Sequence, residues 1–320
     1  MNDHVTASAA PDTKGPGFRH ELFPYQGETA FLDGAVSFIK DAVAGSETVL
    51  VAVGATKQEV LRQELAGTDA AKSVTYLDAA ELGRRPGRLI SAWADRITDS
   101  TAKGQPVRGI SESQWTGRTP GERAELQYYE WLLNRAFTAA PAWWLLCPYD
   151  TTSVEADVLQ TARSNHPLLR AAQSGPNTDY QDGPYPFPDL GAPCDPPYQE
   201  LVFHAGDLAQ VRDKVTGCAT AHHLEPGRLL DLLAAVTEAA ANSIRHGGGT
   251  GTLRTWTEQD ELICEVRDTG HFQEPLAGHL RPRHDQNGGR GLWLIHQLCD
   301  LVQIRTTQDG TTVRMITALS

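Results

Sequence analysis

Residues 228–246 read RLLDLLAAVTEAAANSIRH and, wound as an α-helix, present two distinct faces. Apolar side chains recur every three or four positions, which predicts a helix with one face in a hydrophobic core: Leu229, Leu233, Val236, Ala240 and Ile244. Glu238, Asn242 and His246 recur every four residues and therefore share a second face. By itself, such a polar row is more often a solvated surface than a binding site.

The chemistry of this polar row nevertheless suits a nucleotide. Mg²⁺ prefers hard oxygen ligands and keeps several waters, so the side-chain oxygen of Asn242 suffices as its protein ligand. Glu238, one turn earlier, can accept the proton of an attacking hydroxyl. We therefore expect a general base at Glu238 and a magnesium ligand at Asn242.

Two glycine motifs follow the helix. In Val266-Arg-Asp-Thr-Gly270, a strand ends in Asp268, which can accept a hydrogen bond from an adenine amine, and Gly270 lets the base approach the backbone. In Gly288-Gly-Arg-Gly291, glycines open a helix whose free N–H groups and dipole suit a phosphate, and Arg290 adds positive charge. Each motif alone is also typical of an ordinary turn or flexible loop.

The order of the motifs is more specific than any one of them. Four motifs follow one another along the chain: the polar helix, an Asp-x-Gly after a strand, a Gly-x-Gly-Leu at a helix start, and Gly310-Thr311-Thr312 before a last strand. This series resembles the GHKL ATPases, the superfamily of gyrase, Hsp90, MutL and histidine kinases. The resemblance implies ATP and Mg²⁺ as cofactors, with Glu238 as general base, Asn242 on Mg²⁺ and Asp268 on adenine. It also implies a phosphate lid and pocket wall formed by His246, Gly270, Gly288, Gly289, Arg290, Gly291, Leu292 and either Thr311 or Thr312.

Residues 200–320 are predicted to form one domain around these motifs. Expected strands cover residues 201–203, 251–257, 261–267, 302–305 and 311–316. Expected helices cover residues 208–220, 228–245 and 292–301. Helices before and between antiparallel strands predict a two-layer α/β sandwich, the GHKL ATPase fold.

Residues 18–170 show a different pattern, in which strands alternate with helices. Expected strands cover residues 48–54, 73–77, 107–110 and 143–147, and expected helices cover 57–65, 122–139 and 154–163. This alternation predicts a parallel sheet covered by helices, an α/β/α domain. Residues 1–17 are expected to be a disordered tail, and the proline-dense residues 171–199 a linker.

The N-terminal domain has a resemblance of its own, to the MEDS sensory domain. It rests on His20-Glu-Leu-Phe-Pro-Tyr25, the strand at residues 49–54, Glu130 with Leu133-Asn134, Leu146-Cys-Pro-Tyr-Asp150 and Asn165-His-Pro167. The resemblance implies a RecA-like fold and the sensing of small hydrocarbon derivatives. Residues 54–59 lack the P-loop pattern, so we expect no nucleotide hydrolysis in this domain.

A sensory pocket for a small apolar ligand can draw on several aromatic side chains: Trp115, Tyr128, Tyr129, Trp131, Trp143 and Trp144. For any one of them plain core packing is the commoner role. The candidate ligand contacts are Trp115 and a group expected to cluster at strand ends: His20, Tyr149, Asp150 and His166.

Within the GHKL superfamily, the compact domain and the form Asn242-Ser-Ile-Arg-His246 resemble the anti-sigma-factor serine kinases. These proteins bind a sigma factor and phosphorylate a serine of an anti-anti-sigma (STAS-type) protein, and related domains often pair as homodimers. The implied function is a sensor-gated anti-sigma factor that regulates transcription. Two alternatives stay open. One is a non-catalytic, nucleotide-responsive module that binds a sigma factor. The other is a histidine kinase, which is disfavoured because it would need a helical hairpin in place of the proline-dense residues 171–199.

Composition narrows the partners and the compartment. A formal net charge of -12 disfavours direct binding to nucleic acid or to an anionic membrane. The five cysteines form no CxxC pair, so their spacing indicates neither a disulfide framework nor a zinc site. No apolar stretch is long enough to span a membrane and no signal peptide is evident, so we expect a cytoplasmic protein.

Overall fold

The computed structural model describes residues 17–138, 142–171, 173–187, 190–191, 198–272, 274–282 and 289–319. They form two compact units that interleave along the chain. The first unit holds residues 1–77, 99–113 and 137–183, and the second holds residues 78–98, 114–136 and 184–320. Residues 78–98 and 114–136, placed in the N-terminal domain from sequence, thus group with the second unit.

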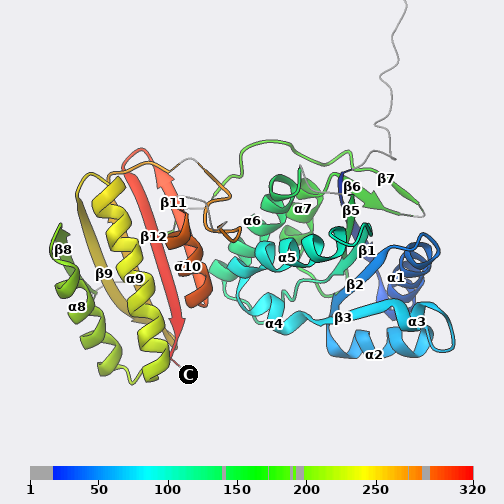
Figure 1. The fold of residues 1–320 in the computed structure, drawn as a ribbon, viewed down its shortest axis with the longest axis horizontal. Coiled ribbons are helices and arrows are strands. Elements are labelled where there is room, and N and C mark those ends of the chain that lie inside the picture. Colours follow the sequence, from blue (N-terminus) through cyan, green and yellow to red (C-terminus); the bar gives the residue numbers. More distant parts are fainter. Residues whose placement is uncertain are drawn as a thin grey trace, which may run out of the picture. The chain divides into compact units, whose positions relative to one another are not determined.

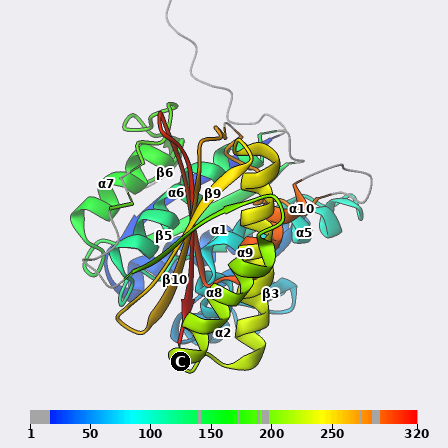
Figure 2. The same cartoon turned by 90° about the vertical axis from the view of Figure 1, so that its left-hand side faces the viewer.

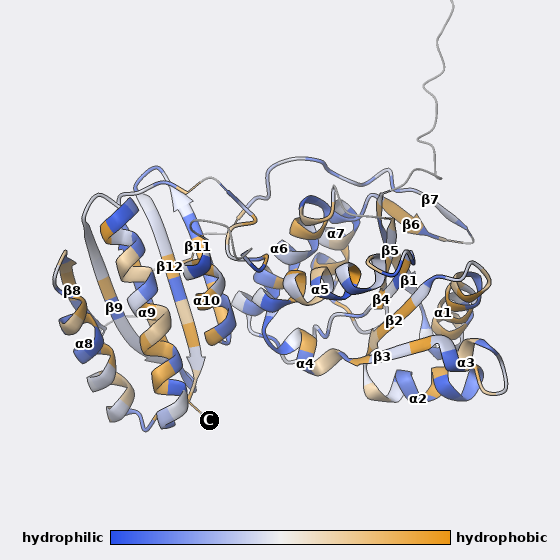
Figure 3. Ribbon diagram, viewed as in Figure 1, coloured by the Kyte–Doolittle hydropathy of each residue, from blue (hydrophilic) through white to orange (hydrophobic). Residues whose placement is uncertain are grey.

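The first unit is built on a seven-stranded sheet in the order β3-β2-β4-β5-β1-β6-β7 (Figure 1). Its strands are β1 (Phe18–Tyr25), β2 (Thr48–Val53), β3 (Val74–Asp78), β4 (Val107–Ser111), β5 (Trp143–Asp150), β6 (Leu168–Arg170) and β7 (Ser174–Pro176). Strands β2, β4, β5, β1 and β6 run parallel, and β7 is antiparallel to β6. The predicted parallel sheet is therefore confirmed, and β2 is hydrophobic along its length, as a buried parallel strand should be (Figure 3).

The helices of the first unit are α1 (Gly27–Ala44), α2 (Ala55–Glu64), α3 (Ala70–Ser73) and α7 (Ala156–Asn165). Helix α1 was not predicted, although its buried residues recur at helical spacing: Phe31, Ala35, Val36, Phe38, Ile39 and Ala42. Gly34 lets α1 approach β1 closely, because a Cβ there would stand 2.2 Å from the Phe23 ring.

The second unit contains a five-stranded antiparallel sheet in the order β11-β12-β10-β9-β8. Its strands are β8 (Gln199–His204), β9 (Thr250–Glu258), β10 (Glu261–Asp268), β11 (Leu301–Thr307) and β12 (Gly310–Ala318). Helices α8 (Leu208–Ala221), α9 (Pro226–His246) and α10 (Arg290–Leu298) cover one face of this sheet (Figures 1 and 2). This arrangement is the predicted two-layer α/β sandwich.

Helix α9 is well specified by its own sequence. Pro226 occupies its first turn, the Glu225 carboxylate accepts the Arg228 N–H at 3.0 Å, and Gly247 ends it. Of the predicted core stripe, Val236 and Ala240 are fully buried, and the remaining members pack at the rim of the same core.

Several predicted boundaries differ from the structure, and the end of α10 is one of them. The expected helix at residues 292–301 ends at Leu298, because Cys299 has extended backbone angles. The Asp300 N–H then donates to the Ile316 carbonyl at 3.1 Å, so Leu301 already belongs to β11.

The other helices of the second unit are α4 (Ala79–Arg84), the 3₁₀ turn η1 (Pro86–Arg88), most of α5 (Leu89–Thr101) and α6 (Pro120–Ala136). Helix α6 starts with a capping box in which Thr119 and Glu122 exchange backbone-to-side-chain hydrogen bonds of 2.9 and 3.2 Å. Its Glu125 forms a buried ion pair of 2.5 Å with Arg305 of β11. Among the described helices, none combines the length and hydropathy that a membrane span requires.

Candidate functional site

A cavity of about 400 Å³ lies between α9, the end of β10, the start of α10 and β12. Eight of the residues selected from sequence line it: Asn242, His246, Asp268, Gly270, Gly289, Gly291, Leu292 and Thr311. These residues are spread over about seventy positions of the chain, so the fold brings the separate motifs into one place. Gly288 lies outside the described residues.

Asp268 is held firmly at one end of this cavity. Its Oδ2 accepts the Ser243 hydroxyl at 2.5 Å, and its Oδ1 accepts the Gly270 N–H at 2.8 Å. Each carboxylate oxygen retains a second lone pair, so the group can still accept a hydrogen bond from a ligand amine. Ser243, buried on α9, was missed from sequence because nothing in its spacing links it to a residue 25 positions later.

Three glycines allow backbone segments to converge on Asp268. A Cβ on Gly247 would stand 2.3 Å from the Asp268 Cγ, and one on Gly270 would stand 2.7 Å from the His246 carbonyl oxygen. Gly310 has φ +126° and its Cβ would stand 1.9 Å from the Asp268 carbonyl oxygen. Side chains at these positions would collide with Asp268 or with the backbone around it and push these segments apart.

The other end of the cavity combines the polar row of α9 with the start of α10. Gly289, with φ 80°, precedes α10, whose first turn carries the positive end of the helix dipole. A Cβ on Gly291 would stand 2.7 Å from Glu238 Oε2 and 3.2 Å from Asn242 Nδ2. The half-buried side chains of Glu238 and Asn242 thus both lie beside the N-terminus of α10. Their oxygens are of the type that Mg²⁺ prefers, and the helix N-terminus suits a phosphate.

The two threonines of the β12 motif differ in position. The Thr311 hydroxyl donates to the Gly270 carbonyl at 2.8 Å, which places Thr311 in the cavity wall. Thr312 follows on the strand and its side chain therefore points to the opposite face of the sheet. Apolar residues that sequence reasoning did not select complete the wall, and they suit the faces of a purine ring: Phe272, Ala277, Ile304 and Val313.

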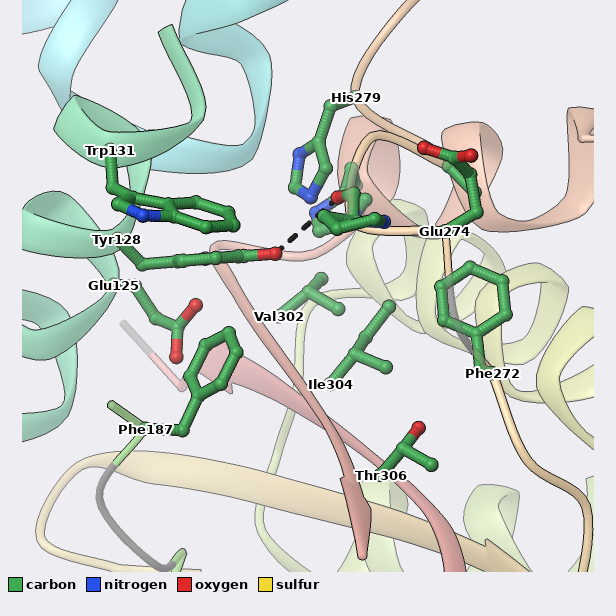
Figure 4. Close-up of a pocket in the computed structure, with 13 residues that line it drawn as sticks. Glu125, Tyr128, Trp131, Phe187, Phe272, Glu274, His279, Val302, Ile304 and Thr306 are labelled. Atoms are coloured by element: carbon green, nitrogen blue, oxygen red, sulfur yellow. Dashed lines mark hydrogen bonds between the residues drawn. The ribbon is translucent and has the colours of Figure 1, made fainter. Parts of the chain in front are cut away.

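A second cavity, of about 170 Å³, adjoins the first within the same unit (Figure 4). Phe272, Ala277 and Ile304 line both cavities. On its other side the second cavity is lined by Tyr128 and Trp131 of α6, and the Tyr128 hydroxyl donates to the Pro275 carbonyl at 3.4 Å. The two cavities therefore share one wall, and α6 lines the second of them.

Buried ionisable groups surround the second cavity. Burial lowers the pKa of His296 to about 4. Burial lowers the pKa of His279 well below its usual value too, and the nearby His296, whose ring centroid is 4.5 Å away, adds to this effect. Both imidazoles are therefore neutral at pH 7. Burial also raises the pKa of Glu125 although Arg305 opposes that shift.

Part of the predicted sensory group lies together in the first unit. The His20 and His166 rings have centroids 3.9 Å apart, and the Tyr149 ring lies edge-on to His166 at 5.9 Å. Asp150 instead caps its own turn, where Oδ1 accepts the Thr152 N–H and hydroxyl at 3.0 and 2.7 Å. Trp115 belongs to the second unit.

Comparisons with known proteins match both halves of the chain. Residues 19–167 match the family MEDS, the methanogen/methylotroph DcmR sensory domain, and residues 203–317 match the histidine kinase-like ATPase domain. Among solved structures, the RsbU and RsbW domains of a protein from Mycobacterium tuberculosis share 17% identity over 39% of this chain, with a TM-score of 0.30. The match spans 33% of that solved chain. Comparison with curated proteins found no match.

Proposed function

We propose that this chain, which joins a MEDS sensory domain to a histidine kinase-like ATPase domain, is a sensor-gated anti-sigma factor with protein-serine kinase activity. Its substrates would be ATP and a serine of an anti-anti-sigma protein, and its second partner a sigma factor. The observation that supports this most is the meeting of Asn242, Asp268 and Gly291 in one cavity with Glu238 directly beside it. The form Asn242-Ser-Ile-Arg-His246 favours the serine-kinase branch of the superfamily.

In this proposal each residue has a separate task. Asp268 accepts a hydrogen bond from the adenine amine, and Phe272 and Ile304 exclude water from the faces of the base. Asn242 holds Mg²⁺, which supplies charge neutralisation to the phosphates when it is bound. The first turn of α10 orients the terminal phosphate with its N–H groups.

Glu238 completes the transfer step. It accepts the proton of the substrate serine hydroxyl while that oxygen bonds to the γ-phosphorus and the bond to the leaving ADP breaks. Phosphoryl transfer depends mainly on positioning and charge stabilisation, so few other side chains are needed.

The test is transfer of label from γ-labelled ATP to a purified STAS-type anti-anti-sigma protein. Asn242→Ala should abolish transfer, whereas Gln210→Ala, an amide removed from the exposed face of α8, should leave it unchanged. Transfer that survives Asn242→Ala would remove the magnesium assignment and with it this catalytic proposal.

One observation favours a second candidate, a nucleotide-responsive module that binds a sigma factor without chemistry. Asn242 and Asp268 line the cavity but Glu238 does not, since Gly291 lies over it. Stoichiometric capture of a sigma factor, altered by ATP but without phosphoryl transfer, would select this candidate. Phosphohistidine formed with ATP would instead point to the histidine kinase alternative, for which the exposed His222 and His223 are the first residues to examine.

A further inference from the structure

Three metal-ligating side chains lie together inside the first unit. His20 comes from β1, Cys147 from β5, and His166 from the turn after α7. Each has at most 1% of its surface exposed. Their candidate ligand atoms, imidazole nitrogen or thiol sulfur, all lie within 4.8 Å of one another. We propose that these three side chains bind one zinc ion.

The parallel pairing of β1 with β5 places the first two ligands. His20 pairs with Leu145, and Cys147 pairs with Leu22. Since side chains alternate along a strand, His20 and Cys147 project from the same face of the sheet. The His20 Nε2 and the Cys147 Sγ are 3.3 Å apart. Zinc–ligand bonds of about 2.0–2.3 Å in a tetrahedral site place neighbouring ligand atoms roughly 3.3–3.8 Å apart, so the pair already has the required spacing.

The third ligand is oriented by a hydrogen bond to the backbone. His166 Nδ1 lies 2.7 Å from the Ala162 carbonyl oxygen, which can only accept, so Nδ1 carries the proton. The Nε2 nitrogen is then the unprotonated one, which is the form that binds a metal ion. Metal-bound histidines commonly use such a second hydrogen bond to fix ring orientation and tautomer. The Asn177 amide donates to the His166 carbonyl at 2.7 Å and holds this turn in place.

The chemistry of the three ligands selects the ion. A thiolate with two imidazoles suits a borderline transition metal such as zinc and disfavours Mg²⁺ or Ca²⁺, which prefer oxygen. Binding would release the Cys147 thiol proton. The site also explains why cysteine spacing gave no sign of it: its ligands come from three elements, and only one is a cysteine. It is separate from the cavity beside Asp268 and does not depend on the kinase proposal.

The experiment measures metal in the intact protein. The chain is expressed with added zinc, purified without chelators, and analysed by mass spectrometry for bound metal. We expect about one zinc per chain in the wild type and in Cys218→Ser, a matched loss of a buried cysteine from α8. Cys147→Ser and His166→Gln should each weaken zinc binding more than about 100-fold. Retention of stoichiometric zinc by both variants would overturn the proposal.

A second measurement uses only the wild-type protein, so it tests the site even if a variant fails to fold. X-ray absorption at the zinc edge of the wild type should show one sulfur and two imidazole ligands, and cobalt substitution should produce a thiolate-to-cobalt absorption band. A wild-type protein without stoichiometric zinc and without that band, or a zinc shell that contains no sulfur, would refute the site.

Discussion

Replacing Asp268 by asparagine tests the base end of the nucleotide cavity. The carboxylate accepts one hydrogen bond on each oxygen, from Ser243 and from the Gly270 N–H. An asparagine can keep its oxygen on the Gly270 N–H and turn its amide toward the Ser243 hydroxyl, which then accepts instead of donating. The fold should therefore survive, while the group offered to an adenine amine loses its negative charge and one of its two acceptor oxygens.

The expected loss follows from the charge of the acceptor. A hydrogen bond to a charged group contributes about 1.5–3 kcal/mol, and each 1.4 kcal/mol is a factor of ten in affinity. Asp268→Asn should thus weaken ATP binding about 10- to 100-fold, measured by displacement of a fluorescent ATP analogue. Asp260→Asn, an exposed aspartate in the turn between β9 and β10, is the matched control and should change little. A folded Asp268→Asn protein that binds ATP within about twofold of wild type would refute the role given to this carboxylate.

Three further predictions concern stability, all measured by urea denaturation. The pKa of His296 is about 4 in the folded chain, whereas an exposed histidine in the unfolded chain has a pKa of 6.5. As pH falls, the unfolded chain therefore binds a proton before the folded chain does. Stability should therefore be complete above pH 6.5 and drop by about 3 kcal/mol toward pH 4, and His296→Leu should lose that part of the pH dependence; an unchanged profile in the variant would contradict this. Glu125→Ala removes the carboxylate that forms an ion pair with the buried Arg305 and should cost about 3 kcal/mol, whereas replacing both residues by apolar ones should restore most of that stability. Equal losses in the single and double variants would argue against the ion pair. Gly310 has φ +126° and its backbone lies against that of Asp268, so Gly310→Ala should destabilise the fold by at least about 2 kcal/mol and weaken ATP binding. Gly217 faces open space on α8, so Gly217→Ala should be neutral or stabilising. Similar effects at the two glycines would contradict the close approach of Gly310 to Asp268.

The elements with strong periodicity or clear caps could be predicted from the sequence. Helix α9 carries an apolar stripe, a proline start and a glycine end, so local signals all agree on it. Strand β2 is short and apolar after Thr48, which identifies it as buried. Helix α1 escaped prediction because Gly34 interrupts an apolar pattern that packing against β1 makes favourable.

The site divides in the same way. Asn242, Asp268 and Gly291 stand in ordered motifs, so their residue types and sequence order carried the prediction. The hydrogen bond from Ser243 to Asp268 depends on the packing of α9 against β10. The closeness of Cys147 to His20 depends on the pairing of β5 with β1. Such partners depend on register and packing between distant segments, which no local pattern of residues encodes.

The central claim is that ATP binds with Mg²⁺ in the cavity formed by α9, α10 and the end of β10. Calorimetric titration of the intact chain with ATP tests it most directly, first with Mg²⁺ and then with a chelator. We predict one ATP per chain, weaker binding without Mg²⁺, and no dependence on Mg²⁺ in Asn242→Ala. Failure of the wild-type chain to bind ATP under either condition, or an Mg²⁺ dependence that persists unchanged in Asn242→Ala, would contradict the account.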